Sequence, residues 1–491
     1  MFESADLDHK TDKATWKQEE SLLREQLLEA QFALGKLKPC AALIIVGGVD
    51  GAGKSETVHL LNEWMDPRHI HTYAFAAPSE EERERPPMWR FWRVLPPAGK
   101  IGIFYGSWYT GPILSRVQDA RNEALFENQL ALIRRHEQML IDEGLLLLKF
   151  WFHLSREQQQ ERLKRLEKDD MTRWRVTRED WRRFKQYDRF RKVSAHALRS
   201  TSTGQSPWTV VPGLDHRYRS LMVGKQLLSA LQQRLERKSV GISLPSAIAP
   251  LSGSAELLQR LDLSKTVSKK RYQSQLEKSQ SELNRLCRSK RFRSRSLVMV
   301  FEGWDAAGKG STIRRVTAAL DARFYKIIPV AAPSQEEREQ PYLWRFWRQL
   351  PGNGQVVIFD RSWYGRVLVE RVEGFCAADD WMRAYGEIND FEQQLVDAGS
   401  VLCKFWLQIS ADEQHRRFKE RQNTPFKQFK ITDEDWRNRE KRADYEVAVS
   451  DMIDRCSTEL APWTLVEAEC KQWARIKVLN TLVAQLEASL D

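Results

Sequence analysis

The chain has 491 residues, and its 78 Lys and Arg outnumber its 67 Asp and Glu to give a formal net charge of +11 at pH 7. Hydrophobic residues make up 42% of the chain and charged residues 30%, a balance typical of soluble globular proteins that excludes an intrinsically disordered protein. The longest apolar runs are too short to span a bilayer, and the first residues lack the apolar core of a secretory signal.

The six cysteines are scattered along the chain without a C-x-x-C pair. We therefore expect neither a disulfide framework nor a zinc ribbon, and the pattern fits a reducing cytoplasm. The basic excess predicts an anionic partner, but charge alone does not choose between nucleic acid, nucleotides and another polyanion.

The first predicted elements are a strand at residues 41–46 and a glycine-rich loop that follows it directly. The loop matches the pattern G-x-x-x-x-G-K-[ST], in which backbone N–H groups wrap a phosphate and the lysine adds a mobile positive charge. The helix after such a loop points its N-terminus at the anion. A glycine turn that binds nothing is the alternative, and the strand before the loop argues against it. The loop residues concerned are Gly48, Asp50, Gly53, Lys54 and Ser55.

A long repeat follows the loop, because residues 76–96 return at residues 331–351 with 16 of 21 positions identical at an offset of 255. The same offset carries Lys54 onto Lys309 and brings several shorter motifs into register. One constant shift over so long a span indicates two full copies of a domain and not a solenoid of short repeats.

Ser, Gly and Pro accumulate between the two copies, and charged residues become sparse there. We predict two homologous domains at residues 1–238 and 256–491, joined by a linker at residues 239–255. Within each copy apolar strand candidates alternate with helical segments, which predicts a parallel sheet covered by helices on both faces. In the second copy the strand candidates are residues 296–301, 326–331, 355–359, 401–409 and 463–468.

Helical periodicity marks residues 381–398 and 436–455 of the second copy. Residues 269–295 read as a basic amphipathic helix with a solvated charged face, and attraction to a polyanion is the minority interpretation. Extra charged helices are predicted at residues 334–350 and 411–457, in addition to those that cover the sheet, and they are candidates for a lid.

The second phosphate loop departs from the pattern at one place, where Gly310 replaces the Ser or Thr that usually contacts magnesium. Both loops contain an aspartate, Asp50 and Asp305, and a carboxylate there repels phosphate unless a cation or a proton intervenes. This aspartate predicts chemistry different from that of an ordinary ATPase. The residues expected to bind phosphate in the second loop are Gly303, Ala307, Gly308, Lys309, Gly310 and Ser311.

Another acidic position follows the strand at residues 355–359, which leads into Asp360 and Arg361. Such a strand delivers its acid to the carboxyl edge of the sheet, where an aspartate can hold magnesium. The adjacent guanidinium can neutralise transferring phosphoryl oxygens. A surface ion pair is the alternative, and the upstream phosphate loop makes it the weaker interpretation.

Four strings of the second copy, GWDAAGKG, LWRFW, FDRSWYGR and APWTLV, together resemble the polyphosphate kinase 2 family. The resemblance covers most of both halves of the chain. It implies an α/β fold, a P-loop kinase-like three-layer α/β/α parallel sheet with a helical lid. It also implies transfer of a phosphoryl group between inorganic polyphosphate and a nucleotide with Mg²⁺, and the tandem arrangement implies AMP as the acceptor and ADP as the product.

The resemblance further implies roles for single residues. Asp305 and Lys309 would lie at the transferred phosphate, and Asp360 would serve the metal and phosphate site, with Asp305 as a second candidate for the metal. A lid around residues 410–450 would help to cover the polyphosphate channel. Further charged positions that match the family motif are Arg361, Glu370 and Arg421.

The two copies differ at these charged positions. At the offset of 255, the counterparts of Asp360, Arg361, Arg366, Glu370 and Arg421 are Tyr105, Gly106, Gly111, Ser115 and Leu166. Phosphoryl transfer depends on preorganised charge, so we predict that residues 256–491 carry catalysis and that residues 1–238 are structural or regulatory. Basic residues that only the second copy keeps, Arg314 and Arg366 among them, are predicted to bind phosphate.

The aromatic string around Trp344, Phe346 and Trp347 has two interpretations. Its rings could stack on bases, as in proteins that bind single-stranded nucleic acid. Packing inside the domain is favoured, because the string persists in the copy that has lost the charged positions. We therefore predict no nucleic-acid partner.

Transfer of the terminal phosphoryl group of polyphosphate to AMP is the favoured function, and two others stay open. An ATP-dependent nucleoside monophosphate kinase shares the loop and the lid. A non-enzymatic protein that binds nucleic acid or another polyanion suits the first copy better than the second. The sequence does not determine the assembly state, and a homo-oligomer is one of the alternatives.

Overall fold

The computed structural model describes all residues except 120, 237–254, 426–427, 429–430, 432 and 491. The chain divides into two compact units. Unit 1 comprises Met1–Pro78, Arg90–Gly241 and Ser334–Trp344, and unit 2 comprises Ser79–Trp89, Ile242–Pro333 and Arg345–Asp491. The predicted linker at residues 239–255 lies, apart from residue 255, outside the described residues.

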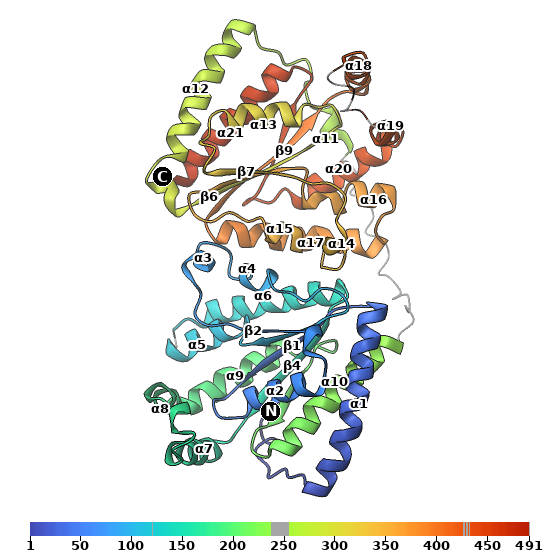
Figure 1. Ribbon diagram of the computed structural model, residues 1–491. Helices are drawn as coiled ribbons and strands as arrows, with labels where there is room; N and C mark the ends of the chain where they lie inside the picture. The colour runs from blue at the N-terminus through green and yellow to red at the C-terminus, as the bar shows by residue number, and fades with distance from the viewer. Residues whose placement is uncertain (120, 237–254, 426–427, 429–430, 432, 491) are drawn as a thin grey trace. The chain divides into compact units, whose positions relative to one another are not determined.

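Unit 1 is built on a five-stranded parallel sheet with the strand order β2-β3-β1-β4-β5. Helices α1, α2 and α10 pack together, and α5, α6 and α9 form a second group, so that helices cover the sheet on two sides (Figure 1). The strands are β1 (Ala42–Gly48), β2 (Ile70–Ala74), β3 (Ile101–Tyr105), β4 (Leu146–His153) and β5 (Trp208–Pro212). The helices up to residue 118 are α1 (Lys13–Leu37), α2 (Lys54–Trp64), η1 (Pro67–His69), α3 (Glu80–Arg83), α4 (Trp89–Trp92) and α5 (Thr110–Gln118). Those that follow are α6 (Glu123–Asp142), α7 (Arg156–Lys168), η2 (Arg173–Arg175), α8 (Arg178–Phe184), α9 (Tyr187–Thr201) and α10 (His216–Glu236).

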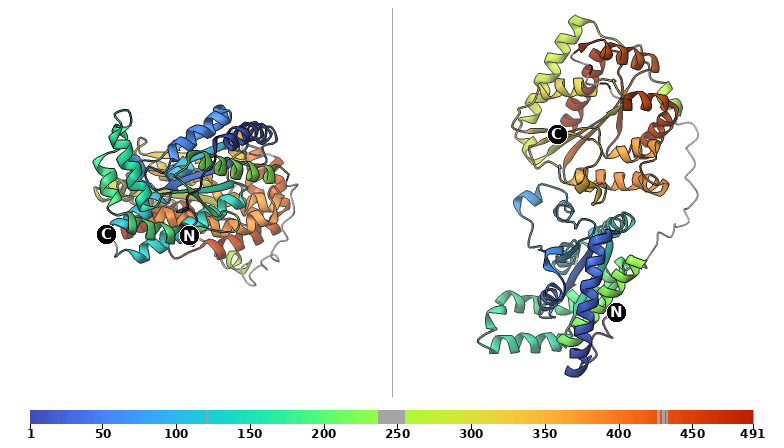
Figure 2. Two further views of the ribbon diagram at one scale, coloured as in Figure 1. Left: turned by 90° about the horizontal axis from the view of Figure 1, so that it is seen from below. Right: turned by 45° about the vertical axis from the view of Figure 1, so that its right-hand side comes forward.

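Unit 2 repeats this sheet with the strand order β10-β9-β6-β8-β7, again all parallel. Helices α12, α13 and α21 pack together, as do α16, α17 and α20 (Figure 1 and Figure 2). The strands are β6 (Ser296–Gly303), β7 (Tyr325–Pro329), β8 (Val356–Asp360), β9 (Ser400–Gln408) and β10 (Trp463–Glu467). The helices up to residue 366 are α11 (Ala255–Gln259), α12 (Lys269–Cys287), η3 (Arg291–Ser294), α13 (Lys309–Thr317), α14 (Gln335–Arg338), α15 (Trp344–Trp347) and η4 (Trp363–Arg366). Those that follow are α16 (Val369–Glu373), α17 (Ala378–Asp397), α18 (Ala411–Gln422), α19 (Asp433–Glu440), α20 (Arg442–Cys456) and α21 (Lys471–Leu490).

The central strands are rich in apolar residues, which favours their burial in the middle of the sheet. In β6 the residues from Ser296 to Glu302 are all buried, as expected for a parallel strand with helices on both faces. The register pairs Phe301 of β6 with Asp360 of β8, so the carboxyl ends of these neighbours meet at one edge of the sheet. Open parallel sheets bind ligands at that edge. The predicted duplicated α/β fold is therefore confirmed.

Two predicted helices differ from the structure. The segment at residues 334–350 forms only the short helices α14 and α15, and none of its residues lines the pocket of unit 2 described below. Its rings Trp344, Phe346 and Trp347 are buried, which confirms the packing interpretation and leaves no ring free to stack on a base. The segment at residues 436–455 is divided at Lys441 into α19 and α20.

Within the described residues, no helix is long and apolar enough to cross a membrane.

Candidate active site

The phosphate loop of unit 2 connects β6 to α13 through two glycines in left-handed conformations. Gly303 has φ 142°, and a Cβ atom there would lie 2.5 Å from the carbonyl oxygen of Leu407, so no larger residue fits. Gly308 has φ 110° and forms the N-cap of α13. Lys309 Nζ donates to the carbonyl oxygens of Gly303 at 2.7 Å and Trp304 at 3.3 Å, which folds the ammonium group back over the loop.

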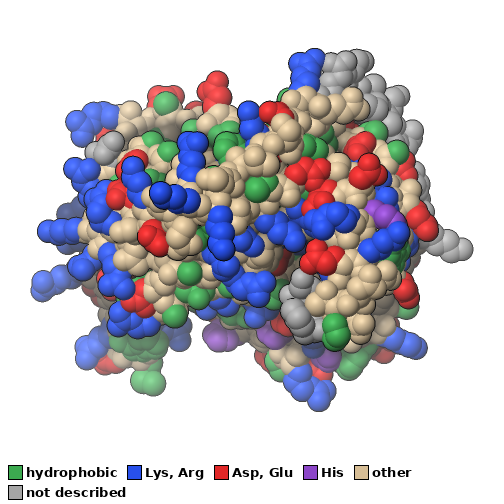
Figure 3. Space-filling view, turned by 90° about the horizontal axis from the view of Figure 1, so that it is seen from above, with side chains coloured by type: hydrophobic (Ala, Val, Ile, Leu, Met, Phe, Trp, Pro, Cys, Tyr) green, Lys and Arg blue, Asp and Glu red, His purple; other side chains and the backbone are tan. Residues whose placement is uncertain are grey.

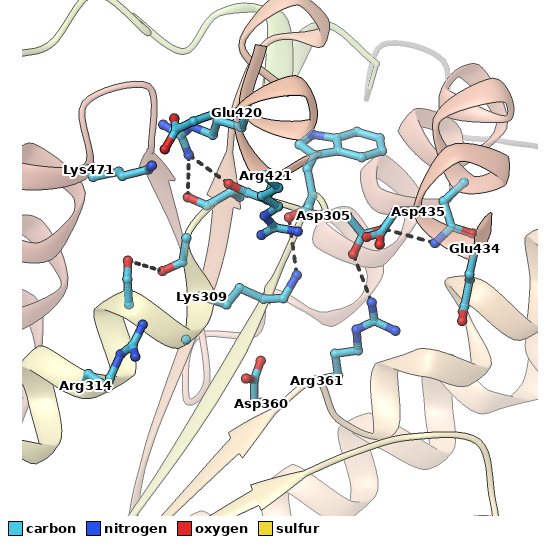
Figure 4. Close-up of a pocket in the computed structure, with 18 of the residues that line it drawn as sticks. Asp305, Lys309, Arg314, Asp360, Arg361, Glu420, Arg421, Glu434, Asp435 and Lys471 are labelled. Atoms are coloured by element: carbon cyan, nitrogen blue, oxygen red, sulfur yellow. Dashed lines mark hydrogen bonds and ion pairs between the residues drawn. The ribbon is translucent and has the colours of Figure 1, made fainter. Parts of the chain in front are cut away.

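A cavity of about 680 Å³ opens beside this loop (Figure 4). Seven cationic side chains and five carboxylates line it, so the wall carries a positive excess that favours an anion. Lys and Arg side chains are also abundant on the face that Figure 3 shows. The charged lining residues are Lys309, Arg314, Arg361, Arg417, Arg421, Lys471, Arg475, Asp305, Asp360, Glu420, Glu434 and Asp435.

Asp360 stands at the end of β8 and lines this cavity. In Figure 4 it lies among Lys309, Arg314 and Arg361, and no dashed line reaches its carboxylate. No group of three or more His, Cys, Asp or Glu that could hold a metal occurs among the described residues. A magnesium ion is usually held by one or two carboxylates together with substrate phosphates and water, and Asp360 fits that donor set.

Asp305 lies in the loop, and both oxygens of its carboxylate accept hydrogen bonds. Its Oδ1 accepts a hydrogen bond from Arg361 Nη2 at 2.9 Å, and its Oδ2 accepts one from Asn438 Nδ2 at 3.0 Å. Burial alone raises the pKa of Asp305, but the charges of Lys309 and Arg361 outweigh it and hold the pKa below its usual value. Asp305 is therefore an ionised hydrogen-bond acceptor that joins the phosphate loop to the turn at Arg361 and to Asn438 of α19.

Arg361 reaches Asp305 from an unusual backbone conformation. Its φ is 65°, the left-handed region that side chains other than glycine adopt at a cost of roughly 1–2 kcal/mol. In unit 1 the same position is Gly106 with φ 76°, so the turn itself is common to both units. Unit 2 thus carries a guanidinium at a position whose backbone favours glycine.

Helices α18 and α19 cover one side of the cavity, as the lid prediction for residues 411–457 anticipates. Arg417 of α18 is almost fully buried and donates to the carbonyl oxygens of Ala306 and Ala307 at 3.0 Å each. It also donates to the carbonyl oxygens of Ala468 and Glu469 at 2.8 Å each. Arg417 therefore fixes the back of the phosphate loop to the lid.

Three predicted residues, Gly303, Arg366 and Glu370, lie outside the cavity lining. Arg366 in η4 and Glu370 in α16 form an ion pair with each other, with Nε to Oε2 at 2.9 Å. Gly303 forms the base of the loop, beside the cavity and not in its wall. The other predicted positions line the cavity together: Asp305, Ala307, Gly308, Lys309, Gly310, Ser311, Arg314, Asp360, Arg361 and Arg421. Their catalytic, phosphate-binding and metal-binding roles remain predictions.

Several residues of this site were not predicted from the sequence, and Glu302, Arg417 and Asn438 are three that make structural contacts. Glu302 is buried at the end of β6, where its Oε1 accepts a hydrogen bond from Ser362 Oγ at 2.8 Å. Burial raises the pKa of Glu302, and the nearby charge of Lys309 opposes that shift. An acid within an otherwise apolar strand was a signal that could have identified it. Arg417 and Asn438 belong to highly charged helices, in which nothing distinguishes them from solvated residues.

Unit 1 keeps the loop but changes what faces it. Gly48 and Gly53 have φ 132° and 84°, and Lys54 Nζ donates to the carbonyl oxygen of Gly48 at 2.7 Å, much as Lys309 does in unit 2. Where unit 2 has Asp360, however, unit 1 has Tyr105, whose hydroxyl oxygen accepts a hydrogen bond from Ser55 Oγ at 3.2 Å. A neutral phenol replaces the carboxylate that could hold a metal.

A salt-bridge cluster also lies against the loop of unit 1. Glu56 in the first turn of α2 pairs with Arg162 at 2.9 Å and with Arg219 at 2.6 Å. The guanidinium of Arg219 lies so close to the loop that a Cβ atom on Gly53 would be 2.1 Å from it. The counterparts of Glu56 and Arg219 in unit 2 are Ser311 and Ala474, so unit 2 has neither partner of this ion pair.

A parallel sheet with a glycine-rich loop before a helix, a lysine folded over that loop and an acid on the neighbouring strand defines a P-loop phosphotransferase. The family model of polyphosphate kinase 2 matches residues 10–239 and 266–490. The chain belongs to the polyphosphate kinase 2 family, and each half carries one copy of the family's domain.

Similar proteins extend over the full length. The chain is 55% identical to the polyphosphate:AMP phosphotransferase of Pseudomonas aeruginosa, covering 100% of this chain and 99% of the relative. It is 51% identical to the polyphosphate:AMP phosphotransferase of Pseudomonas syringae pv. tomato, covering 99% and 98%. A crystal structure of a polyphosphate kinase 2 from Pseudomonas aeruginosa superimposes with a TM-score of 0.91 at 52% sequence identity, covering 100% of this chain and 99% of that one.

Proposed function

We propose that this protein transfers the terminal phosphoryl group of inorganic polyphosphate to AMP, which gives ADP and a polyphosphate shorter by one phosphate. The observation that carries the proposal is the cavity of unit 2, where Lys309, Asp360 and Arg361 surround one space at the end of the sheet. The two full-length relatives named polyphosphate:AMP phosphotransferase support the choice of donor and acceptor.

In this reaction an oxygen of the AMP phosphate attacks the terminal phosphorus, and the bond from that phosphorus to the bridging oxygen breaks. The electron pair of that bond stays on the shortened polyphosphate. Little covalent work falls to the protein, so positioning and charge neutralisation carry the rate. We assign the loop amides and Lys309 to the phosphate groups, and Arg361 and Arg421 to the negative charge that develops on the transferring oxygens.

Asp360 is the residue that would hold Mg²⁺ together with phosphate oxygens. Magnesium, when bound, neutralises charge on the phosphates and orients them for in-line attack. Each oxygen of Asp305 accepts one hydrogen bond, from Arg361 and from Asn438, so Asp360 is the less encumbered carboxylate for the metal.

Asp305 could also orient or deprotonate the acceptor phosphate. A phosphate monoester has its second pKa near 6, so AMP needs no base at pH 7.5 and we favour orientation through charge. Asp305→Asn keeps the shape and removes the charge, so we expect kcat to fall across the whole pH range. A base would instead show a loss that changes with pH, and full activity of the variant at every pH would end both assignments.

The test of the function is a product assay with polyphosphate, magnesium and each of AMP, ADP, GMP and GDP. We expect ADP to form from AMP, and we expect ATP in place of polyphosphate to be a poorer donor. Equal or better turnover with ATP would instead identify an ATP-dependent nucleoside monophosphate kinase. Polyphosphate binding without any product would identify a non-enzymatic binding protein.

A further inference from the structure

In both units, the aspartate of the phosphate loop is contacted by the same position of the lid. In unit 2 Asn438 of α19 donates from Nδ2 to Asp305 Oδ2 at 3.0 Å. In unit 1 Arg183 of α8 stands at the equivalent position, 255 residues earlier, and its Nη1 lies 3.5 Å from Asp50 Oδ2. Helix α8 lies in the projecting helical part of unit 1 (Figure 2). The contact is therefore a shared feature of the two copies.

The shared contact gives the loop aspartate one structural role that is the same in both units. Unit 1 has Tyr105 and Gly106 where unit 2 has Asp360 and Arg361, so the chemistry around the loop is different. If the loop aspartate served only phosphoryl transfer, unit 1 would not need Asp50, because it lacks the other charged positions of the site. A role as the docking point of the lid helix applies equally to both units.

The partner of the aspartate differs in charge. In unit 1 the pair joins two ions, and Asp50 also lies 3.7 Å from Lys54. In unit 2 the lid contributes a neutral amide, while the second oxygen of Asp305 takes the guanidinium of Arg361. The hydroxyl of Tyr445 in α20 donates to Asn438 Oδ1 at 3.3 Å, which turns the NH₂ group of the amide toward Asp305.

We propose that Asn438 is a positioning residue that docks the lid helix α19 on the phosphate loop through Asp305, and that its neutral amide makes this contact releasable in each catalytic cycle. The contact connects the lid, the loop and the Arg361 turn in one chain of hydrogen bonds. The link to turnover rests on the proposed function, whereas the docking contact itself does not.

Asn438→Asp is the sharpest variant, because it keeps the shape and places a second carboxylate against Asp305. Without substrate, we expect hydrogen–deuterium exchange of residues 433–440 to rise at least about tenfold, since the contact is a hydrogen bond to a charged group. The KM for polyphosphate should rise by a similar factor, with a smaller change in kcat. Unchanged exchange in this helix would overturn the proposal, whatever the activity.

Asn438→Arg introduces the residue of unit 1 and should act in the opposite direction. We expect slower exchange of residues 433–440, a lower kcat and no rise in KM, because opening a lid that is held too tightly limits product release. A raised KM with faster exchange would overturn the claim of a releasable contact. The matched control is Arg183→Asn, which should loosen α8 and leave kcat and KM unchanged.

The two proposals fail separately. If the wild-type chain forms no ADP from AMP and polyphosphate, the proposed function fails, while the exchange measurements still decide the docking contact. If ADP forms and neither variant changes exchange in residues 433–440, only the docking proposal fails.

Discussion

The two units of this chain share an internal network and differ at the edge of the sheet. In each unit a buried lysine of the sheet donates to a buried glutamate, Lys149 to Glu137 at 2.7 Å in unit 1 and Lys404 to Glu392 at 2.6 Å in unit 2. The Trp and Tyr of the Ser-Trp-Tyr string donate to the same glutamate in each unit. Unit 1 keeps this network although it lacks the charged positions of the unit 2 site, so the network belongs to the shared fold.

The largest expected effect tests this shared network. Lys404→Met and Lys149→Met each leave a buried glutamate without its cation, which typically costs about 3–5 kcal/mol of stability. We expect similar downward shifts of the denaturation midpoint from the two variants, measured by tryptophan fluorescence in urea. A large shift from one and none from the other would contradict the idea of an equivalent scaffold.

The next prediction separates the two loops. Lys309→Ala removes a preorganised charge at the transferring phosphate and should lower kcat by on the order of 10²–10³-fold. Lys54→Ala is the matched control and should leave kcat within about twofold. The measurement is ADP formation from AMP and polyphosphate at saturating magnesium. Full loss from Lys54→Ala with none from Lys309→Ala would reverse the assignment of the units.

A third prediction concerns the acid that only unit 2 possesses. Asp360→Asn keeps the size of the side chain and removes its charge, so kcat should fall by on the order of 10²-fold and the magnesium concentration for half-maximal rate should rise. Tyr105→Phe, at the same place in unit 1, should change neither quantity. A magnesium titration of both variants measures this. An unchanged titration for Asp360→Asn would remove Asp360 from the metal site.

The smallest expected effect is a pH dependence of stability that arises from a buried histidine present only in unit 1. His136 is fully buried between Trp92 and Trp108, and burial lowers its pKa to about 3, whereas unit 2 has Phe391 at this position. The unfolded chain binds a proton at this histidine below its ordinary pKa of about 6.5 while the folded chain does not, so stability falls as the pH drops from there.

His136→Phe removes this difference. Relative to the wild type, the variant should gain about 2 kcal/mol between pH 7.5 and pH 5, from the pKa difference that persists at pH 5. Urea denaturation of both proteins at the two pH values measures the gain. The same wild-type-to-variant difference at both pH values would show that folding does not lower the pKa of His136.

Much of the fold was predictable because it depends on local pattern. The apolar runs that predicted strands at residues 296–301 and 355–359 correspond to β6 and β8, and the offset of 255 predicted that the sheet would appear twice. The predicted helix at residues 334–350 was wrong, since Trp344, Phe346 and Trp347 are drawn into the core and leave only two short helices. The charged residues of this segment predicted an exposed lid helix. Burial of the three aromatic rings instead draws the segment onto the domain.

The candidate site was predictable only where a motif marked it. Lys309, Asp360 and Arg361 follow strands in recognisable strings, and the structure brings them to one cavity. Glu370 and Arg366 belong to the same string, yet they pair with each other beside the cavity. Sequence spacing gives the edge of the sheet that a residue reaches but not the direction of its side chain.

The sequence by itself determined that one P-loop domain occurs twice and that only the second copy has the charged positions that we assign to phosphoryl transfer. Those conclusions need only residue identity and a constant offset. Tertiary structure decided which charges meet: Asp305 with Arg361 and Asn438, and Glu56 with Arg162 and Arg219. Such pairs join residues more than 50 positions apart, and a charge on a helix carries no local mark of the partner that folding brings to it.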